Sequence, residues 1–507
     1  MKKTIFFIMV ITVLSKILGF LREIFLAYFY GASAVSDAYL ISITIPTVIF
    51  AFVGTALATS YIPLYTSIEK EKGEKEALRF SNNLINFLLL FCFLIAGASF
   101  VFAQPIVKVF ASGFTGETLR LAVFFTRVSI VAVFFMGLTY IFRSYLQIKN
   151  DFISPALIGF PYNVIVIASI VLSVKVDLVF LPVGLVLAIA SQFLFVMPFA
   201  CKKGYRYQFI MDKSDPQVRK VIYLALPVIL GTSVTQINTL VDRTLASGIA
   251  VGGISALNYA NQLSTFIHGI FVMSLSTVMY PMIARMVVEK NIEGLKKTLG
   301  EAVNGIGLIV VPITVGTMLF AAPIVQLLFG RGAFDIRAAG LTSSALFFYA
   351  IGILGTAMLE ILSKTFYAMQ DTKTPMTNAV IAVVVNIVLN IILSRFLGIG
   401  GLALATSISA LLGALLLFMS LRRKIGPLGI MNMATTFVKV VLASAIMGMA
   451  AKGAYNFILP QAGSNFALLA AVLAGGLVYS VVIYFMRIRE VQVLVDAGKR
   501  RLAGYFS

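Results

Sequence analysis

Charged residues are scarce in this sequence: Asp, Glu, Lys and Arg make up 12% of its 507 residues. A soluble domain carries about 25%. No polar segment is long enough to form a large soluble domain, whereas hydrophobic residues account for 60% of the chain. They recur in runs that reach the roughly 20 residues a helix needs to cross a bilayer. The scarcity of charge therefore predicts an integral membrane protein that crosses the bilayer many times.

Cysteine, histidine and catalytic motifs are also scarce. Cys92 lies inside an apolar run and Cys201 at a helix end, so we interpret both as inert thiols. The single histidine, His268, lies in an apolar helix, where a packed or pore-lining role is expected rather than a metal site. The sequence has no nucleophile elbow, P-loop, paired-histidine motif or Asp-rich nucleotide-sugar motif. We expect a transporter and not an enzyme, without a cofactor and driven by a gradient.

The apolar runs are continuous and do not alternate with polar residues, as barrel strands do. Because the bilayer core contains no water, each backbone group must be bonded within its own segment, which predicts helices. We predict an all-α integral membrane protein with about fourteen transmembrane helices. The spans are predicted near residues 4–29, 36–66, 78–106, 119–145, 153–174, 178–200, 219–246, 255–285, 296–328, 339–368, 376–395, 401–420, 435–456 and 465–486.

Lysine and arginine are concentrated in one set of the connections between these spans. The set contains Lys70, Lys72, Lys75, Arg79, Lys202, Lys203, Arg206, Lys213, Arg219, Lys220, Lys290, Lys296, Lys297, Arg422, Arg423, Lys424, Arg487, Arg489, Lys499, Arg500 and Arg501. The other set is nearly bare, as in residues 33–36, 247–254 and 461–465. This asymmetry predicts a cell-membrane protein with both termini in the cytoplasm. Because the basic residues are scattered over short loops, nucleic acid is not an expected partner.

The two halves of the sequence resemble each other. Residues 102–107 recur as 320–325, and Asn163 recurs as Asn386, at a nearly constant offset. An even number of spans separates the copies, so the repeat is parallel, as in transporters whose two lobes form a cavity that opens alternately to either side. A duplication used only for packing is the alternative. We predict two pseudo-symmetric six-helix lobes, at 1–210 and 211–425, two additional helices at 426–490, and a cytoplasmic tail at 491–507.

Several ionisable side chains lie inside the predicted spans, where a charge costs at least about 2.5 kcal/mol and normally faces a cavity or a partner. Glu360 and Lys364 have the spacing of a structural ion pair. The first span contains three ionisable residues, Lys16, Arg22 and Glu23, which is more than helix packing requires. Guanidinium groups bind phosphate in a bidentate manner, and lysine acts as a point charge. We predict that Lys16 and Arg22 contact a pyrophosphate, while Glu23 and Asp37 balance their charge.

A second polar group predicts an ion site. Asn386 and Asn390 share one face of span eleven, Thr406 lies in span twelve, and Asp242 ends span seven. Hard cations take carboxylate, amide and hydroxyl oxygens as ligands. We predict that these four residues bind a sodium ion and couple transport to its gradient, and we expect no other metal. The alternatives are a proton on Asp242, or asparagines that only form bonds between helices.

Several segments together form a recognisable pattern: Ser15 to Glu23 with Gly31 and Ser36 to Tyr39, Asp242 to Ser247, Leu257 to Ala260, Leu328 to Gly332, and Phe366 to Pro375. These segments resemble those of one family, the MurJ (MviN) lipid II flippases. The resemblance covers nearly the whole chain. It implies the fourteen-helix fold of the multidrug/oligosaccharidyl-lipid/polysaccharide exporter superfamily. It also implies lipid transport for peptidoglycan synthesis, a part of cell-wall biogenesis that sets cell shape. The implied substrate is lipid II, an undecaprenyl pyrophosphate with a sugar-peptide head, and the last two helices are implied to form a groove for its tail.

The sequence departs from the family pattern at three positions. The family usually has arginine where Lys16 stands, often has one near Val48 in span two, and often has one where this chain has Gln262. The resemblance thus adds Gln262 to the candidate substrate-binding residues, together with Arg127 and Arg243 as replacements for the missing cations.

Other readings of the sequence stay open at this stage. They are a flippase for another undecaprenyl-linked glycan, a drug/cation antiporter, and a membrane glycosyltransferase. A cationic first helix disfavours an antiporter for cations, and no loop is long enough for the hydrophilic catalytic region that such glycosyltransferases need. Expected partners are membrane lipids, the lipid-linked precursor, and cell-wall synthesis or division proteins.

Overall fold

The computed structural model describes residues 2–492, and this part of the chain is helical without any strand. The predicted tail at 491–507, with Lys499, Arg500 and Arg501, lies outside the described residues from 493 onward. The helices are α1 (Lys2–Tyr30), α2 (Ala34–Lys72), α3 (Glu74–Val101), α4 (Ala103–Phe110), α5 (Gly116–Ser129), α6 (Ala132–Ile148), α7 (Ile153–Leu157), α8 (Gly159–Lys175), α9 (Phe180–Lys202), α10 (Pro216–Ile249), α11 (Gly253–Val288), α12 (Ile292–Leu319), α13 (Ala321–Phe329), α14 (Ile336–Ala368), α15 (Lys373–Leu397), α16 (Ile399–Ile425) and α17 (Ile430–Phe485).

Most of these helices are long enough to cross a membrane. Among the described residues, nine helices are sufficiently long and apolar, and two bent helices raise the number to eleven. The bent helices are α5 with α6, at 42°, and α11, which bends by 53° between Val272 and Ser276. In addition, α17 contains two helices joined at Gly463, whose φ is 78°, so it can supply two spans. Helices α1 and α10 are also long, but charged residues interrupt their apolar segments. The all-helical class is confirmed, and the helices are consistent with the predicted fourteen spans.

Two predicted spans are broken near their ends. The chain leaves the helix at Phe102 and at Phe320, so that α3 is followed by the short helix α4 and α12 by the short helix α13. Pro105 and Pro323 lie in the first turn of these short helices, where a proline is tolerated because its missing N–H would have no helical partner. The two breaks have similar backbone angles, φ −95° and ψ 25° at Phe102 and φ −116° and ψ 22° at Phe320.

A second local structure also recurs in both halves. Asn150 and Gln370 each adopt a φ of 59°, and each precedes an aspartate that caps the following helix. Asp151 accepts a hydrogen bond from the backbone N–H of Ser154 at 3.1 Å, and Asp371 accepts one from Thr374 at 3.1 Å. The similar residues of the two halves thus form the same loop.

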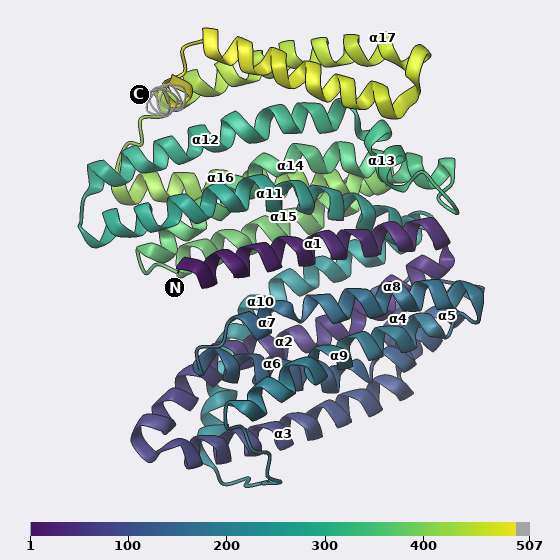
Figure 1. Cartoon of the computed structure of the whole chain (residues 1–507), viewed down its shortest axis with the longest axis vertical. Coiled ribbons are helices and arrows are strands. Elements are labelled where there is room, and N and C mark those ends of the chain that lie inside the picture. Colours follow the sequence, from purple (N-terminus) through teal and green to yellow (C-terminus); the bar gives the residue numbers. More distant parts are fainter. Residues whose placement is uncertain (1, 493–507) are drawn as a thin grey trace. The chain divides into compact units, whose positions relative to one another are not determined.

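The first compact unit comprises Met1–Ser255 together with Arg331–Ala338. Helix α2 lies at its centre and packs against α3, α5, α6 and α10, while α8 packs against α1 and α9 (Figure 1). Buried tyrosines fill part of its core: the rings of Tyr65 and Tyr145 lie 5.8 Å apart, and those of Tyr145 and Tyr205 lie 5.0 Å apart. Because α10 packs on α2, α3 and α4, the seventh span belongs to this unit.

A short segment from later in the chain also belongs to the first unit. The backbone N–H of Ala333 donates to the carbonyl of Tyr28 at 2.8 Å. Gly31, with a φ of 58°, sits against this segment, and a Cβ at Gly31 would collide with the carbonyl oxygen of Ala333. The glycine therefore allows both the left-handed turn and the close backbone approach.

The second compact unit comprises Ala256–Gly330 and Ala339–Ser507. Within it α15 packs against α16, and α12 packs against α17 (Figure 1). Its core contains buried aliphatic and aromatic side chains from α11, α12, α14 and α16, among them Ile283, Leu299, Phe366 and Leu421. The predicted lobe boundaries stay a prediction.

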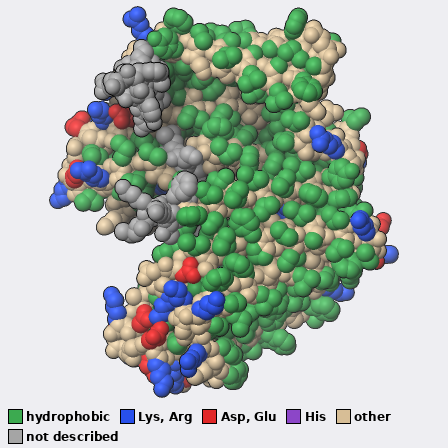
Figure 2. Space-filling view, viewed as in Figure 1, with side chains coloured by type: hydrophobic (Ala, Val, Ile, Leu, Met, Phe, Trp, Pro, Cys, Tyr) green, Lys and Arg blue, Asp and Glu red, His purple; other side chains and the backbone are tan. Residues whose placement is uncertain are grey.

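The surface divides into apolar and charged regions. Figure 2 shows hydrophobic side chains over the sides of the helices and charged side chains gathered at helix ends. At one such end Lys149 lies 2.7 Å from Glu69 and 2.6 Å from Glu74. At another, Lys424 lies 2.7 Å from Asp371. Apolar sides with charged ends are what a bilayer requires.

Candidate functional site

The cationic group of α1 centres on Arg22. Its Nη2 atom lies 2.6 Å from Oε1 of Glu23, whose side chain is 5% exposed. Its Nη1 atom donates to Oδ1 of Asn163 at 3.5 Å, and its guanidinium lies 5.5 Å from the ring centroid of Tyr162. The structure thus brings two predicted site residues, Arg22 and Glu23, into one ion pair and holds that pair against α8.

Asn163 connects α1 and α8. Its Nδ2 atom donates to the carbonyl of Gly159 at 2.8 Å and to that of Ser15 at 3.5 Å. A Cβ at Gly159 would collide with the hydroxyl of Ser15, so the glycine allows the two helices to approach. The sequence indicates Asn163 only as part of the repeat. Its signal was a polar side chain in an apolar span, where it needs a partner.

Lys16 occupies a different environment from the ion pair. It is exposed on α1, whereas Glu23, two helical turns later on the same face, is buried. Its predicted contact with a pyrophosphate stays a prediction.

Asp37 is buried and connects α2 to the beginning of α11. One carboxylate oxygen accepts the backbone N–H of Gly252 at 2.8 Å, and the other accepts the backbone N–H of Ser255 at 2.8 Å and its hydroxyl at 2.6 Å. Arg243 lies close enough to interact electrostatically with Asp37, and its Nη1 atom donates to the carbonyl of Ile254 at 3.2 Å. Asp37 and Arg243 therefore belong to one polar cluster.

Arg127 and Gln262 lie apart from these clusters in the chain. Arg127 is exposed on α5; its Nε atom donates to the carbonyl of Phe100 at 3.3 Å, and its guanidinium lies 5.4 Å from the Phe100 ring centroid. Gln262 is half-buried on α11 in the second unit. Their predicted role as substitutes for family cations stays a prediction.

The predicted ion ligands fall into both units. In the second unit, Nδ2 of Asn390 donates to Oδ1 of Asn386 at 2.8 Å, and Nδ2 of Asn386 donates to the hydroxyl of Thr406 at 3.4 Å. Asp242, half-buried near the end of α10, belongs to the first unit. Residues 2–492 contain no group of three or more His, Cys, Asp or Glu side chains able to hold a metal ion.

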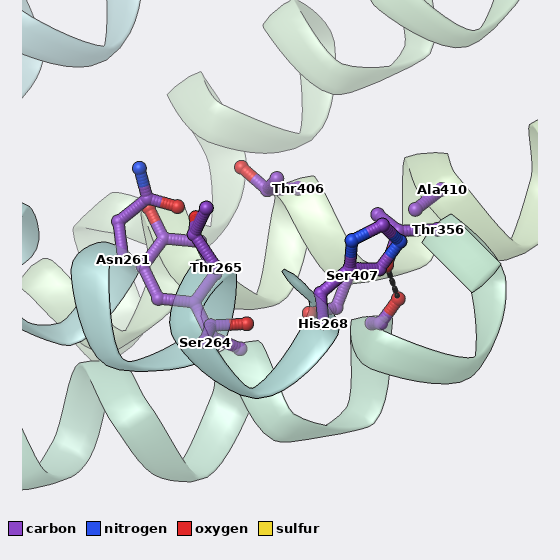
Figure 3. A pocket seen from close by; sticks show the side chains of 10 residues that line it. Asn261, Ser264, Thr265, His268, Thr356, Thr406, Ser407 and Ala410 are labelled. Atoms are coloured by element: carbon purple, nitrogen blue, oxygen red, sulfur yellow. Dashed lines mark hydrogen bonds between the residues drawn. The ribbon is translucent and has the colours of Figure 1, made fainter. Parts of the chain in front are cut away.

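A pocket of about 190 Å³ lies between α11, α14 and α16 of the second unit (Figure 3). Most of its lining surface is apolar, and the polar side chains among its lining residues include Asn261, Thr265, His268, Thr356, Thr406 and Ser407. Figure 3 shows His268 and Thr356 at one end and Asn261 and Thr265 at the other. The sequence did not predict this pocket, because its lining comes from three helices far apart in the chain.

These groups are suited to binding and not to covalent chemistry. A guanidinium has five N–H donors, and the contacts of Arg22 with Glu23 and Asn163 leave donors for a phosphate. A phosphate can replace the Glu23 carboxylate as the partner of Arg22, since both present oxygen pairs to a guanidinium. The cluster on α1 can therefore bind and release an anion.

Known proteins share both the sequence and the fold. The family model described as lipid II flippase MurJ matches residues 26–486. The probable lipid II flippase MurJ of Vibrio cholerae is 29% identical over 459 residues, covering 87% of this chain and 86% of that protein. The probable lipid II flippase MurJ of Thermotoga maritima is 28% identical over 491 residues, covering 96% and 97%. A solved structure of lipid II flippase MurJ in an inward closed conformation matches with a TM-score of 0.83 and 28% identity, covering 94% of this chain and 98% of that one. With the family model matching most of its length, the chain belongs to the MurJ family of lipid II flippases.

Proposed function

We infer that this chain moves lipid II, the undecaprenyl-pyrophosphate-linked precursor of peptidoglycan, from the inner to the outer leaflet by alternating access. The observation that carries this inference is the family match over residues 26–486. The Arg22–Glu23 pair agrees with it, because a half-buried cation with an exchangeable carboxylate partner suits a pyrophosphate. The family is one of transporters and not of enzymes, and the alternative readings are not favoured.

Within this function, we assign the pyrophosphate to Lys16 and Arg22, and the balancing charges to Glu23 and Asp37. Arg127, Arg243 and Gln262 are secondary candidates around the head group. The ion pair of Arg22 supports the first assignment. Asp37 also has a structural role in this proposal, because hydrogen bonds from the backbone and from a hydroxyl group hold its carboxylate in a fixed position.

The chain is a multi-pass protein of the cytoplasmic membrane. We propose that both termini lie in the cytoplasm, which the basic connections support through the positive-inside rule. Attachment of a reporter to each terminus, with its accessibility measured from outside the cell, tests this orientation. Cell-wall synthesis or division proteins are the proposed protein partners.

We propose that a sodium ion binds at Asn386, Asn390 and Thr406 and couples transport to the sodium gradient across the membrane. Their mutual hydrogen bonds place amide and hydroxyl oxygens together in the second unit. The predicted share of Asp242 stays a prediction. Transport in vesicles with an imposed potential, with and without sodium, tests the proposal. Activity that is independent of sodium and survives Asp242→Asn contradicts it.

Depletion in cells tests the transport function itself. When the native protein is depleted, lipid II should accumulate in the inner leaflet and decline in the outer leaflet. An unchanged leaflet distribution of lipid II, with another undecaprenyl-linked glycan accumulating inside, would assign a different substrate.

A further inference from the structure

The single histidine of the chain faces an ion pair in the second unit. Nε2 of His268 on α11 lies 3.4 Å from Oε2 of Glu360 on α14. The other oxygen of Glu360 lies 2.7 Å from Nζ of Lys364, and Lys364 also donates to the hydroxyl of Ser276 at 2.7 Å. One carboxylate is thus shared between a permanent cation and an imidazole whose charge depends on pH.

The net charge of this cluster depends on whether His268 is protonated. With a neutral imidazole, Glu360 and Lys364 cancel each other. A proton on His268 adds one positive charge, and Oε2 of Glu360 lies where it stabilises that charge. Of the residues that the structure describes, Glu360, Lys364 and the phenol of Tyr349 are the titratable groups of α14 around the imidazole. The lining residues of α16, Thr406 and Ser407, do not titrate in this range.

Water can approach His268, because this residue lines the pocket of about 190 Å³ (Figure 3). Its side chain is 25% exposed, and that of Glu360 is 20% exposed. The hydroxyl groups among the lining residues, such as those of Thr356 and Ser407, can hydrogen-bond water. A proton can therefore reach the imidazole from the pocket.

The cluster lies across the bend of α11. The helix bends by 53° between Val272 and Ser276. His268 lies before the bend and contacts Glu360, whereas Ser276 lies after the bend and contacts Lys364. The i,i+4 pair of α14 therefore holds both segments of α11, and a change of charge at His268 alters one of the two attachments.

We propose that His268 is a proton-binding site of this transporter, with Glu360 as its counter-ion, and that its protonation sets the attachment of α11 to α14 and couples transport to a pH gradient in addition to the proposed sodium gradient. The proton passes from water in the pocket to an imidazole nitrogen, and it returns to water in the pocket after alternating access has opened the pocket to the other side of the membrane. Proton binding stands on the geometry alone, whereas coupling rests on the proposed transport function. The site belongs to the second unit, whereas the Arg22 cluster belongs to the first.

Imidazole titration by NMR tests the binding step directly. Because the sequence has one histidine, full-length protein carrying a histidine-free tag and labelled at histidine gives one imidazole signal in lipid nanodiscs. The signal should titrate between pH 5 and 9. Glu360→Gln should lower the midpoint by about one pH unit or more, because an opposite charge within about 4–6 Å favours the charged form. Lys364→Gln should raise it, because it removes a competing cation. Glu289→Gln, at an exposed carboxylate near the end of α11, is the matched control and should leave the midpoint unchanged.

An imidazole that does not titrate in this range, or the same midpoint in the native protein and Glu360→Gln, overturns the site. These measurements need no transport, so they stand apart from the proposed function.

Flipping in vesicles tests the coupling. A gradient of one pH unit should change the leaflet ratio of lipid II by up to about tenfold for one coupled proton. His268→Gln should abolish this dependence, provided its thermal unfolding midpoint matches that of the native protein. Equal gradient dependence in His268→Gln overturns coupling. Absence of lipid II flipping by the native protein would instead contradict the proposed function, while the titration still decides the proton site.

Discussion

Arg22 and Glu23 are adjacent in the sequence, yet their side chains meet, with Nη2 of Arg22 2.6 Å from Oε1 of Glu23. Adjacent residues of a helix normally point in different directions. The guanidinium must therefore fold back over its neighbour, while Asn163 contacts it from α8. We propose that the carboxylate occupies a position that a phosphate of the substrate can take, so that the pair joins substrate binding to substrate release.

Replacement of Glu23 by Gln should slow lipid II turnover more than it weakens binding. The variant removes the anion that displaces the substrate from Arg22, so the bound state should persist. We expect at least a tenfold lower flipping rate at an equal or higher affinity for lipid II, measured in vesicles and by direct binding. Glu117→Gln, at an exposed carboxylate in the first turn of α5, is the control. Normal flipping by Glu23→Gln would rule out this role.

Replacement of Asp37 by Asn should destabilise the first unit. The carboxylate accepts three hydrogen bonds from Gly252 and Ser255, whereas the amide presents N–H groups to some of these donors. A hydrogen bond to a charged group contributes about 1.5–3 kcal/mol. We expect a lower thermal unfolding midpoint for purified protein in detergent. Ser255→Ala, which removes only the hydroxyl partner, should have a smaller effect, and equal midpoints for all three proteins would contradict the account.

Three asparagines of α3 should stabilise the loop before α10. Side chains of Asn82, Asn83 and Asn86 donate to the carbonyls of Arg206, Asp212 and Ile210 at 3.0, 3.0 and 2.8 Å. Each replacement by Ala removes a hydrogen bond to a partly buried carbonyl, and a typical hydrogen bond contributes about 0.5–1.5 kcal/mol. The thermal unfolding midpoint should fall in each variant. Gln104→Ala, at an exposed amide of α4, should leave it unchanged, and a similar loss in that control would contradict a specific role for the loop contacts.

The contribution of Asp371 should depend on pH. The hydrogen bonds from Lys424 and from Thr374 lower the pKa of Asp371 to about 2, below its ordinary value of 3.8. A lowered pKa in the folded state stabilises the protein above the unfolded pKa, and this contribution is lost as pH falls through the folded pKa. The difference in unfolding midpoint between the native protein and Asp371→Asn should therefore be constant above about pH 5 and shrink towards pH 2. A difference that grows on acidification would contradict the assignment.

The spans were predictable because each is a continuous apolar run, and their ends carry recognisable signals. Ser33 begins α2 through a capping box with Ser36. The breaks at Phe102 and Phe320 were missed, although prolines in the following turns were a signal. The bend of α11 between Val272 and Ser276 was also missed. An apolar pattern predicts that a helix forms and not that its axis stays straight.

The candidate site was predictable only in part. Intramembrane charge identified Arg22, Glu23 and Asp37 individually. Their partners Asn163 and Ser255 lie in other helices, and the sequence does not indicate which polar side chains will meet across that distance. Glu360 and Lys364 were interpreted as a structural pair from their spacing. The third member, His268, became visible only when α11 and α14 were seen to pack.

Lipid II flipping by purified protein tests the central claim most directly. Vesicles containing lipid II in the inner leaflet, with its appearance outside measured over time, should show rapid appearance with the native protein and none without it. Removal of one partner of a buried charge pair costs about 2–5 kcal/mol, so Arg22→Ala should slow the rate by at least about thirtyfold. Equal rates for native protein, Arg22→Ala and protein-free vesicles would contradict the account.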